Sequence, residues 1–323
     1  MSNGDVDLFE IARRVLRENG FAPDLPRDLD DSIPAEDPTD GVRDLRELPW
    51  SSIDNAESRD LDQIEFAERL PDGAIRLLVG IADVDAYAAK DSPIDRYALT
   101  NTATLYTPAH IFPMIPAALS EDRTSLLEDR QRLAMVTEMV VREDGSLDEA
   151  GTRVYQARVR NHAKLVYERV GAWLERDEAD DRVEGPPSAL IAEQVGLHDE
   201  AARRLRRRRF EHGALEFETI EARAIAKDGR IVDLQVIRKN RARELVEDLM
   251  IAANGATARF LELRGFSSIR RVVHKPRRWD RIVEIAKGYG TALPAEPAAA
   301  ALATFLIARR RADPARFGEL SLS

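Results

Sequence analysis

The chain has no cysteine in its 323 residues. This absence excludes disulfides, thiolate metal sites and cysteine nucleophiles. Its five histidines are scattered and do not pair at the spacing of metal ligands. A phosphate-binding glycine loop and the serine elbow of a hydrolase triad are also missing. Any catalysis therefore has to come from other groups, and carboxylates are the first candidates.

Long apolar segments are missing as well. The first residues, MSNGDVDLFEIARR, are acidic where a signal peptide is basic and then apolar, and no apolar run approaches the length of a membrane span. We therefore expect a cytoplasmic protein with no membrane partner, while the sequence does not indicate an oligomeric state. With 44% hydrophobic and 33% charged residues, the composition is that of an ordinary globular protein.

Net positive charge is also absent, because the formal net charge is -10. Taken alone, this balance argues against nucleic-acid binding. The arginines are clustered, however, and a nuclease can concentrate its basic residues in one channel. The densest run is RRLRRRR, from Arg203 to Arg209, at the end of an expected helix over 190–210. This run is either a solvated charged face or a surface that contacts phosphates.

The segment DLRELPWSSIDNAESRDLDQ, residues 44–63, contains three closely spaced carboxylates, Asp54, Asp60 and Asp62. In an extended segment Asp60 and Asp62 point to the same side. Asp54 can join them if the intervening NAESR folds back as a turn. Three convergent carboxylates repel one another unless a cation lies among them, and oxygen ligands suit a hard ion such as magnesium. The alternative is a solvated acidic loop, which composition alone favours.

The residues after this segment predict an antiparallel hairpin, with strands over 64–68 and 74–83 around the turn Pro71-Asp72-Gly73. Asp83 and Asp85 follow the second strand, and each is either a further ligand or a turn cap. The proline-rich stretch 99–120 is expected to be a surface loop. Its Tyr106 and Phe112 are either base-stacking platforms or core, with core favoured for Phe112.

The remaining pattern predicts a mixed α+β fold, with a largely antiparallel sheet and surrounding helices. A helix over 240–263 has an apolar stripe, and Glu247 lies off that stripe. We expect an N-terminal helix and linker arm over 1–43 and a main domain over 44–323. The other expected strands cover 133–142, 152–160, 269–274 and a pair within 213–237, and the other helices cover 7–19, 162–174 and 298–312.

Several blocks, in this order along the chain, resemble the catalytic domain of the ribonuclease II family, the RNB exoribonucleases. The blocks are the acidic segment itself, LLVGIADVDAY, TLYTPAHIFPMIPAALSEDRTSL, RLAMVTEMVVREDGSL, NHAKLVYERVGAWLE, HGALEF and ARELVEDLMIAANGATARFL. The resemblance implies helices and strands arranged around an RNA channel. It also implies processive 3′-to-5′ hydrolysis of single-stranded RNA to nucleoside 5′-monophosphates with Mg²⁺, for which Mn²⁺ is a possible substitute.

Matched position by position, the resemblance assigns roles to individual residues. Asp54, Asp60, Asp62 and Gln63 would be the catalytic residues, and the three aspartates would hold the metal. Tyr106 would fix the terminal nucleotide and so set the shortest product. The other residues expected to contact RNA are Phe217, Tyr167 and Glu247 from the motifs, and Arg206 and Arg209 from the basic run.

Two departures from the family pattern affect this expectation. The family has a fourth aspartate where this chain has Gln63, so the site has one negative charge fewer and its metal count is open. The arginine-rich block and the S1 RNA-binding domain that follow in the family do not occur before Ser323, so we expect a catalytic domain that is incomplete at its C-terminus. The alternatives are a non-catalytic RNA-binding relative and a metal-stabilised scaffold with no RNA role.

Overall fold

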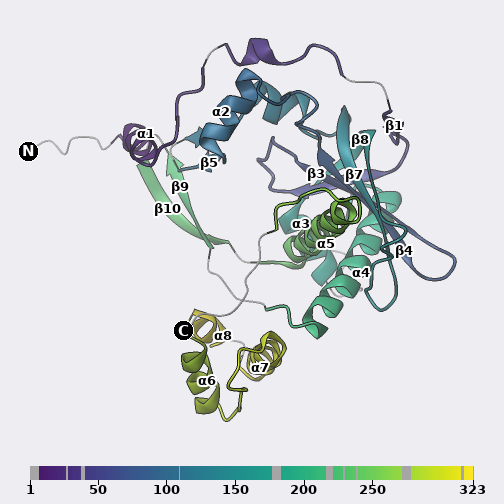
Figure 1. Cartoon of the computed structure of the whole chain (residues 1–323), viewed down its shortest axis with the longest axis vertical. Helices are drawn as coiled ribbons and strands as arrows, with labels where there is room; N and C mark the ends of the chain where they lie inside the picture. Colours follow the sequence, from purple (N-terminus) through teal and green to yellow (C-terminus); the bar gives the residue numbers. More distant parts are fainter. Residues whose placement is uncertain are drawn as a thin grey trace, which may run out of the picture.

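A six-stranded sheet forms the body of the protein in the computed structural model (Figure 1). The structure describes residues 7–26, 28–37, 41–108, 110–176, 183–215, 221–227, 230–237, 239–270, 278–313 and 316–322. The strands run in the order β1-β8-β2-β3-β4-β7. They are β1 (Arg43–Asp44), β2 (Trp50–Asp54), β3 (Gln63–Arg69), β4 (Ile75–Ala82), β7 (Gln131–Val141) and β8 (Arg153–Val166).

The long strand β8 closes this sheet on itself. Its first half pairs antiparallel with β7, and its second half pairs parallel with β2, where Asp54 lies opposite Val166. β1 also runs parallel to β8, whereas β3, β4 and β7 are antiparallel to their neighbours along the chain. The sheet is therefore mixed and largely antiparallel, which confirms the expected fold class.

The hairpin of β3 and β4 is buried on both faces. Leu77 and Val79 point into one apolar cluster, while Leu78 points into a second one on the opposite face. Because both faces are covered, β4 is a nearly continuous apolar run rather than an alternating one. The predicted hairpin and its turn are confirmed, since Gly73 adopts a φ of 82° between the two strands.

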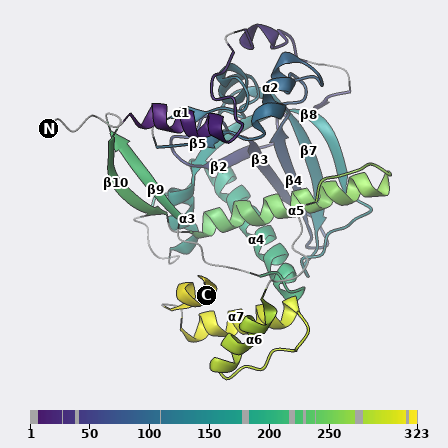
Figure 2. The same cartoon turned by 60° about the vertical axis from the view of Figure 1, so that its left-hand side comes forward.

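Three helices cover the first of these faces: α3 (Tyr167–Glu175), α4 (Ala189–Glu211) and α5 (Arg241–Leu263). Figure 2 shows α5 lying across the sheet with α4 beside it. The carboxylate of Asp248 on α5, which is fully buried, joins the two helices through Arg209 and Arg206 of α4. A buried carboxylate needs such cationic partners, because desolvation would otherwise be costly.

The N-terminal segment is attached to the body by specific contacts. Helix α1 (Leu8–Glu18) is followed by the short helix η1 (Asp30–Ser32). Leu29 is buried against Tyr87 in a third apolar cluster. The Asp37 carboxylate accepts hydrogen bonds from the Tyr87 hydroxyl at 2.6 Å and from Arg158 at 2.9 Å. These contacts fix the segment 28–37 on the outside of the sheet.

The other elements lie around this core. The stretch 99–120, expected to be a loop, contains the end of helix α2 (Pro93–Asn101), the short strand pair β5 (Leu105–Tyr106) and β6 (Ile111–Phe112), and the start of the single turn η2 (Ala118–Arg123). Phe112 is buried, as favoured from the sequence. The hairpin β9 (Glu221–Lys227) and β10 (Arg230–Ile237) extends beside α1 in both views, and α6 (Trp279–Gly288), α7 (Ala299–Ala312) and α8 (Phe317–Leu322) form a separate helical cluster (Figures 1 and 2).

Two sequence-based expectations need correction. The helix expected over 162–174 begins only at Tyr167, because Ala163 and Leu165 are buried in alternation while β8 pairs with β2. The strand expected over 269–274 is not formed at residues 269–270, which have no regular structure, and the rest of it lies outside the described residues.

Candidate functional site

Asp54 ends β2, where the chain leaves the sheet for a short turn. Its Oδ1 accepts hydrogen bonds from the Asn55 backbone N–H at 2.6 Å and from the Ser58 hydroxyl at 2.9 Å. The turn is closed further by the Ser58 N–H, which donates to the Asn55 carbonyl at 3.2 Å. NAESR therefore folds back as the sequence predicted, and one oxygen of Asp54 organises the turn while Oδ2 has no protein partner among these contacts.

Asp60 is linked directly to the aromatic residue that the family resemblance singles out. The Tyr106 hydroxyl donates to Asp60 Oδ2 at 2.7 Å. The rest of Tyr106 is open to solvent, with 64% of its surface exposed. Partial burial of the hydroxyl, together with this bond, raises the pKa of Tyr106 above its ordinary value. Tyr106 therefore donates through its hydroxyl and presents its ring outward beside the carboxylates.

Asp62 interacts electrostatically with both other acids. Although its side chain reaches solvent, the protein packed around its carboxyl group raises the pKa of Asp62, and the charges of Asp54 and Asp60 raise it further. Glu65, three residues further along the chain on β3, is fully buried. Burial, followed by the charges of Asp62 and Asp54, raises the pKa of Glu65 to about 8. This end of the sheet therefore has an excess of negative charge.

The donor chemistry of this cluster fits a divalent cation. All of its side-chain donor atoms are oxygens, which a hard divalent cation prefers. In the described part of the chain, however, no three acidic or histidine side chains are grouped closely enough to hold a metal ion as they stand. Asp54 and Asp60 each have one oxygen engaged elsewhere, in the turn and with Tyr106. Binding a cation would draw the three carboxylates together.

Gln63 is buried behind the acids and does not face solvent. Its Nε2 donates to the Ile53 carbonyl at 3.1 Å. This bond links the first residue of β3 to β2 next to Asp54. The amide therefore holds two acid-bearing strands together, a task that a carboxylate at this position could not perform, because a carboxylate has no N–H to donate.

Tyr167 and Arg243 lie next to the loop that follows Asp54. Tyr167 directly follows Val166, the residue of β8 opposite Asp54, and burial, followed by the charges of Asp54 and Glu65, raises the pKa of Tyr167. The Arg243 guanidinium lies over the Tyr167 ring, 4.4 Å from its centroid, and donates to Asn55 Oδ1 at 2.9 Å. Sequence reasoning missed Arg243, because nothing in the spacing of α5 shows that its first turn meets the loop after β2.

The two acids that follow β4 are not part of this cluster. Asp83 is buried, accepts from Gln156 Nε2 at 2.6 Å, and caps the next turn through the Ala86 N–H at 3.3 Å. Of the two possibilities left open for Asp83, the structure shows the turn cap. Asp85 is exposed at the surface.

The remaining predicted RNA-binding residues are placed differently. Phe217 lies outside the described residues. Glu247 is exposed on α5 and pairs with Lys239 at 2.5 Å. Arg206 contacts Glu244 at 3.3 Å, and Arg209 contacts Asp248, so both guanidinium groups have partners within the protein. Their roles in RNA binding stay predictions.

Two further residues, which sequence reasoning also missed, hold the loop that carries the acids. Ser125 accepts from the Leu61 N–H at 3.0 Å and donates to the Arg59 carbonyl at 2.5 Å. Lys164 donates to carbonyls nearer the start of the loop. Contacts to main-chain carbonyls leave no signal in the sequence, because every residue has a carbonyl.

Comparisons with known proteins identify the family of the chain. The RNB domain model matches residues 42–307. Ribonuclease R of Vibrio parahaemolyticus is 36% identical over 249 residues, which are 77% of this chain and 29% of that protein. Exoribonuclease 2 of Escherichia coli is 32% identical over 279 residues, 84% of this chain and 42% of that protein. The chain thus spans less than half the length of these relatives.

Solved structures share the fold over nearly the whole chain. Mycoplasma genitalium RNase R in complex with ribose-methylated single-stranded RNA has a TM-score of 0.87 at 20% identity, covering 99% of this chain and 50% of that one. Yeast Ssd1, a pseudonuclease, has a TM-score of 0.69 at 14% identity, covering 95% of this chain and 38% of that one. At these identities the likeness establishes the fold and leaves the activity open.

Proposed function

Because the chain belongs to the RNB domain family, we propose that it is a divalent-metal-dependent 3′-to-5′ exoribonuclease. It hydrolyses single-stranded RNA and releases nucleoside 5′-monophosphates, with Mg²⁺ as its cofactor and Mn²⁺ as a substitute. The observation that carries the proposal is the hydrogen bond from the Tyr106 hydroxyl to Asp60 at 2.7 Å. This bond links an exposed aromatic ring, which can stack on a base, to one of three acids that can bind a cation.

In this proposal Asp54, Asp60 and Asp62 hold the metal, which when bound neutralises phosphate charge and lowers the pKa of a water. Asp54 would bind the metal through Oδ2, because its Oδ1 accepts the hydrogen bonds that close the turn. Gln63 fixes the spacing between β2 and β3 through the Ile53 carbonyl. The three aspartates would supply the oxygen ligands, and the turn and strand that carry Asp54 are themselves held by hydrogen bonds.

The aromatic residues supply a grip that does not depend on the base sequence. Every base has a π-face, so a ring such as that of Tyr106 can stack on any terminal nucleotide. The Arg243 guanidinium lies over the Tyr167 ring and is itself paired with the Glu168 carboxylate at 3.1 Å. In this proposal Tyr167, Phe217 and Glu247 complete the RNA path.

A second candidate function is RNA binding without turnover. Gln63 removes one of the negative charges that the family uses at the metal site, and the fold is shared by yeast Ssd1, a pseudonuclease. The fold therefore does not decide between the two functions. The carboxylate cluster favours the nuclease, because a binding protein has no use for three acids beside a phosphate path.

The test uses the 323-residue chain, a 3′-labelled oligoadenylate whose label leaves with the released nucleotide, and either Mg²⁺ or Mn²⁺. We expect AMP release by the wild type and at least a hundredfold slower release by Asp62→Asn, with RNA affinity retained. Asp85→Asn, which removes an exposed acid outside the cluster, serves as the matched control. Unchanged release by Asp62→Asn refutes the assigned site, and tight binding without cleavage in either metal favours the second candidate.

A further inference from the structure

The loop from Asn55 to Leu61 connects Asp54 to Asp60 and Asp62, so its shape sets how the three carboxylates converge. Its second half is held by Ser125, which contacts Arg59 and Leu61. Its first half is held from β8, the strand that runs parallel to β2. The residue responsible is Lys164.

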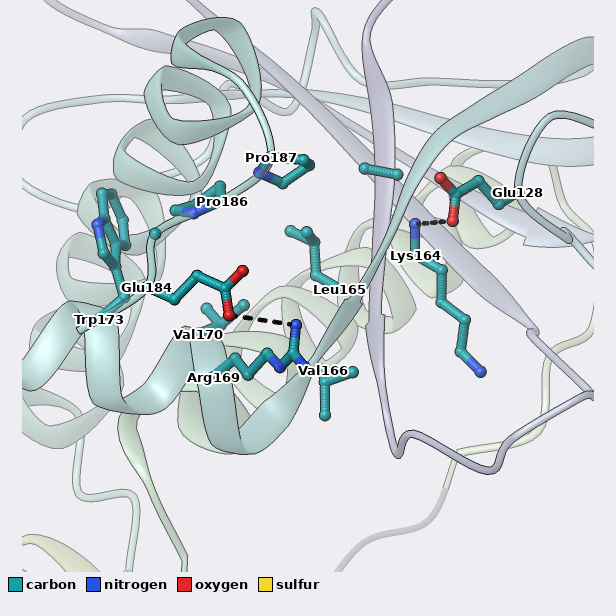
Figure 3. A pocket seen from close by; sticks show the side chains of 12 residues that line it. Glu128, Lys164, Leu165, Val166, Arg169, Val170, Trp173, Glu184, Pro186 and Pro187 are labelled. Atoms are coloured by element: carbon teal, nitrogen blue, oxygen red, sulfur yellow. Dashed lines mark hydrogen bonds and ion pairs between the residues drawn. The ribbon is translucent and has the colours of Figure 1, made fainter. Parts of the chain in front are cut away.

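Lys164 is fixed at its base before it reaches the loop. Its backbone lies opposite Ser52 in the ladder of β2 and β8. Its N–H donates to the Glu128 carboxylate at 3.3 Å, as drawn in Figure 3. Figure 3 also shows the side chain extending away from the cavity lined by Trp173 and Pro186. The lysine therefore starts from a rigid strand and points in one direction.

The tip of the side chain bonds the main chain of the loop at two points. Lys164 Nζ donates to the Ala56 carbonyl at 2.9 Å and to the Ser58 carbonyl at 2.6 Å. Ser58 in turn donates to Asp54 Oδ1 at 2.9 Å. The Lys164 ammonium and the Asp54 carboxylate thus hold the same turn, the first through two main-chain carbonyls and the second through the Ser58 hydroxyl.

We propose that Lys164 is a positioning residue that sets the loop, and with it the spacing of Asp54 and Asp60, for binding the divalent cation. The inference rests on the proposed function. An ammonium that bonds the carbonyls of Ala56 and Ser58 prevents the turn from opening under the mutual repulsion of the carboxylates. Lysine suits the task because three donors radiate from one atom.

The test compares Lys164→Met, which keeps the length but loses the donors, with Lys164→Arg, which keeps donors and charge. Lys90→Met, at an exposed lysine outside the site, is the matched control. Amide hydrogen exchange of residues 55–61 is measured in the metal-free chain, Mn²⁺ affinity by calorimetry, and AMP release from oligoadenylate as separate kcat and KM values.

For Lys164→Met we expect exchange in the loop to be about tenfold faster, the size of change that follows from losing hydrogen bonds to a charged donor. We also expect at least tenfold weaker Mn²⁺ binding and a lower kcat at unchanged KM. Lys164→Arg recovers most of each effect. If Lys164→Met does not fold, the same measurements on Lys164→Gln, which keeps a shorter neutral donor, replace it.

Mn²⁺ affinity and loop exchange within twofold of the wild type in Lys164→Met would overturn the inference while leaving the proposed function intact. Equal loss in Lys164→Met and Lys164→Arg would also overturn it, because the loss would then reflect packing rather than donation. A wild-type chain that binds no Mn²⁺ and releases no AMP would instead refute the proposed function, and the Lys164 inference with it.

Discussion

We expect the ring of Tyr106 to contribute to RNA binding and its hydroxyl to contribute to metal binding through Asp60. The residue is 64% exposed, whereas its hydroxyl is hydrogen-bonded to Asp60. Stacking of a base on an aromatic ring is worth about 1–3 kcal/mol by alanine substitution, or roughly 5- to 150-fold in affinity. The hydroxyl bond, at an exposed site, is worth about 1 kcal/mol and acts on Asp60 rather than on RNA.

Tyr106→Ala should therefore weaken RNA binding by that 5- to 150-fold range, whereas Tyr106→Phe should bind RNA within about twofold of the wild type. The resemblance to the RNB family adds that the shortest product should lengthen in the alanine variant. Tyr106→Phe should instead alter Mn²⁺ affinity, by up to about fivefold, because Asp60 loses a hydrogen-bond donor.

The measurement is fluorescence anisotropy of a 5′-labelled oligoadenylate with the divalent metal removed by a chelator, so that binding is read without cleavage. Tyr289→Ala, at a half-exposed tyrosine in the C-terminal helical cluster, controls for the loss of any surface tyrosine. The reasoning fails if Tyr106→Ala binds RNA as the wild type does, or if Tyr106→Phe is as weak as Tyr106→Ala.

Two other predictions concern the helices behind the site. His198 on α4 is fully buried with both ring nitrogens unpartnered, and burial lowers its pKa from 6.5 to about 3, so its neutral form is favoured by folding. The contribution of the neutral His198 to stability is fully present above pH 6.5 and is lost as the pH falls towards 3. Between pH 7 and pH 5 the free energy of unfolding of the wild type should therefore drop by about 2 kcal/mol more than that of His198→Leu. Urea unfolding at the two pH values measures this difference. Asp248→Ala should lower the free energy of unfolding by about 3 kcal/mol, because it removes the buried carboxylate that joins α4 to α5. Asp144→Ala, which breaks a surface pair with Arg208, should have a much smaller effect, and equal losses would contradict the role of burial.

Asp54, Asp60 and Asp62 lie close together along the chain, and NAESR forms the turn that its composition permits. The convergence of the three carboxylates stays a prediction, because no three acids in the described part of the chain are grouped closely enough to hold a metal ion. The hairpin of β3 and β4 could be predicted from local sequence. Its strands are adjacent in sequence and its turn contains a glycine at positive φ.

The partners of these acids could not be predicted, because they come from distant parts of the chain. Lys164 reaches the loop only because β8 continues as a strand to Val166 and runs parallel to β2. The sequence HAKLVYERV fits a helix as well as a strand, and only the pairing with β2 decides between them. Arg243 is likewise brought to Asn55 by the packing of α5, which no local pattern encodes.

The arginine run of α4 shows why charge density along a sequence is an incomplete guide to where RNA would bind. In the structure the run faces several directions, and its members have acceptors within the protein. Carboxylates on α5 hold Arg206 and Arg209, and a carboxylate of the preceding helical turn holds Arg203 at 2.7 Å. A guanidinium that is already paired must give up that partner before it binds a phosphate, so its net contribution to RNA affinity is small. The net charge of -10 adds no general attraction for a polyanion. For this reason the proposed function depends on the Tyr106 ring, and on the cation that Asp60 and the other carboxylates would hold, more than on the arginines.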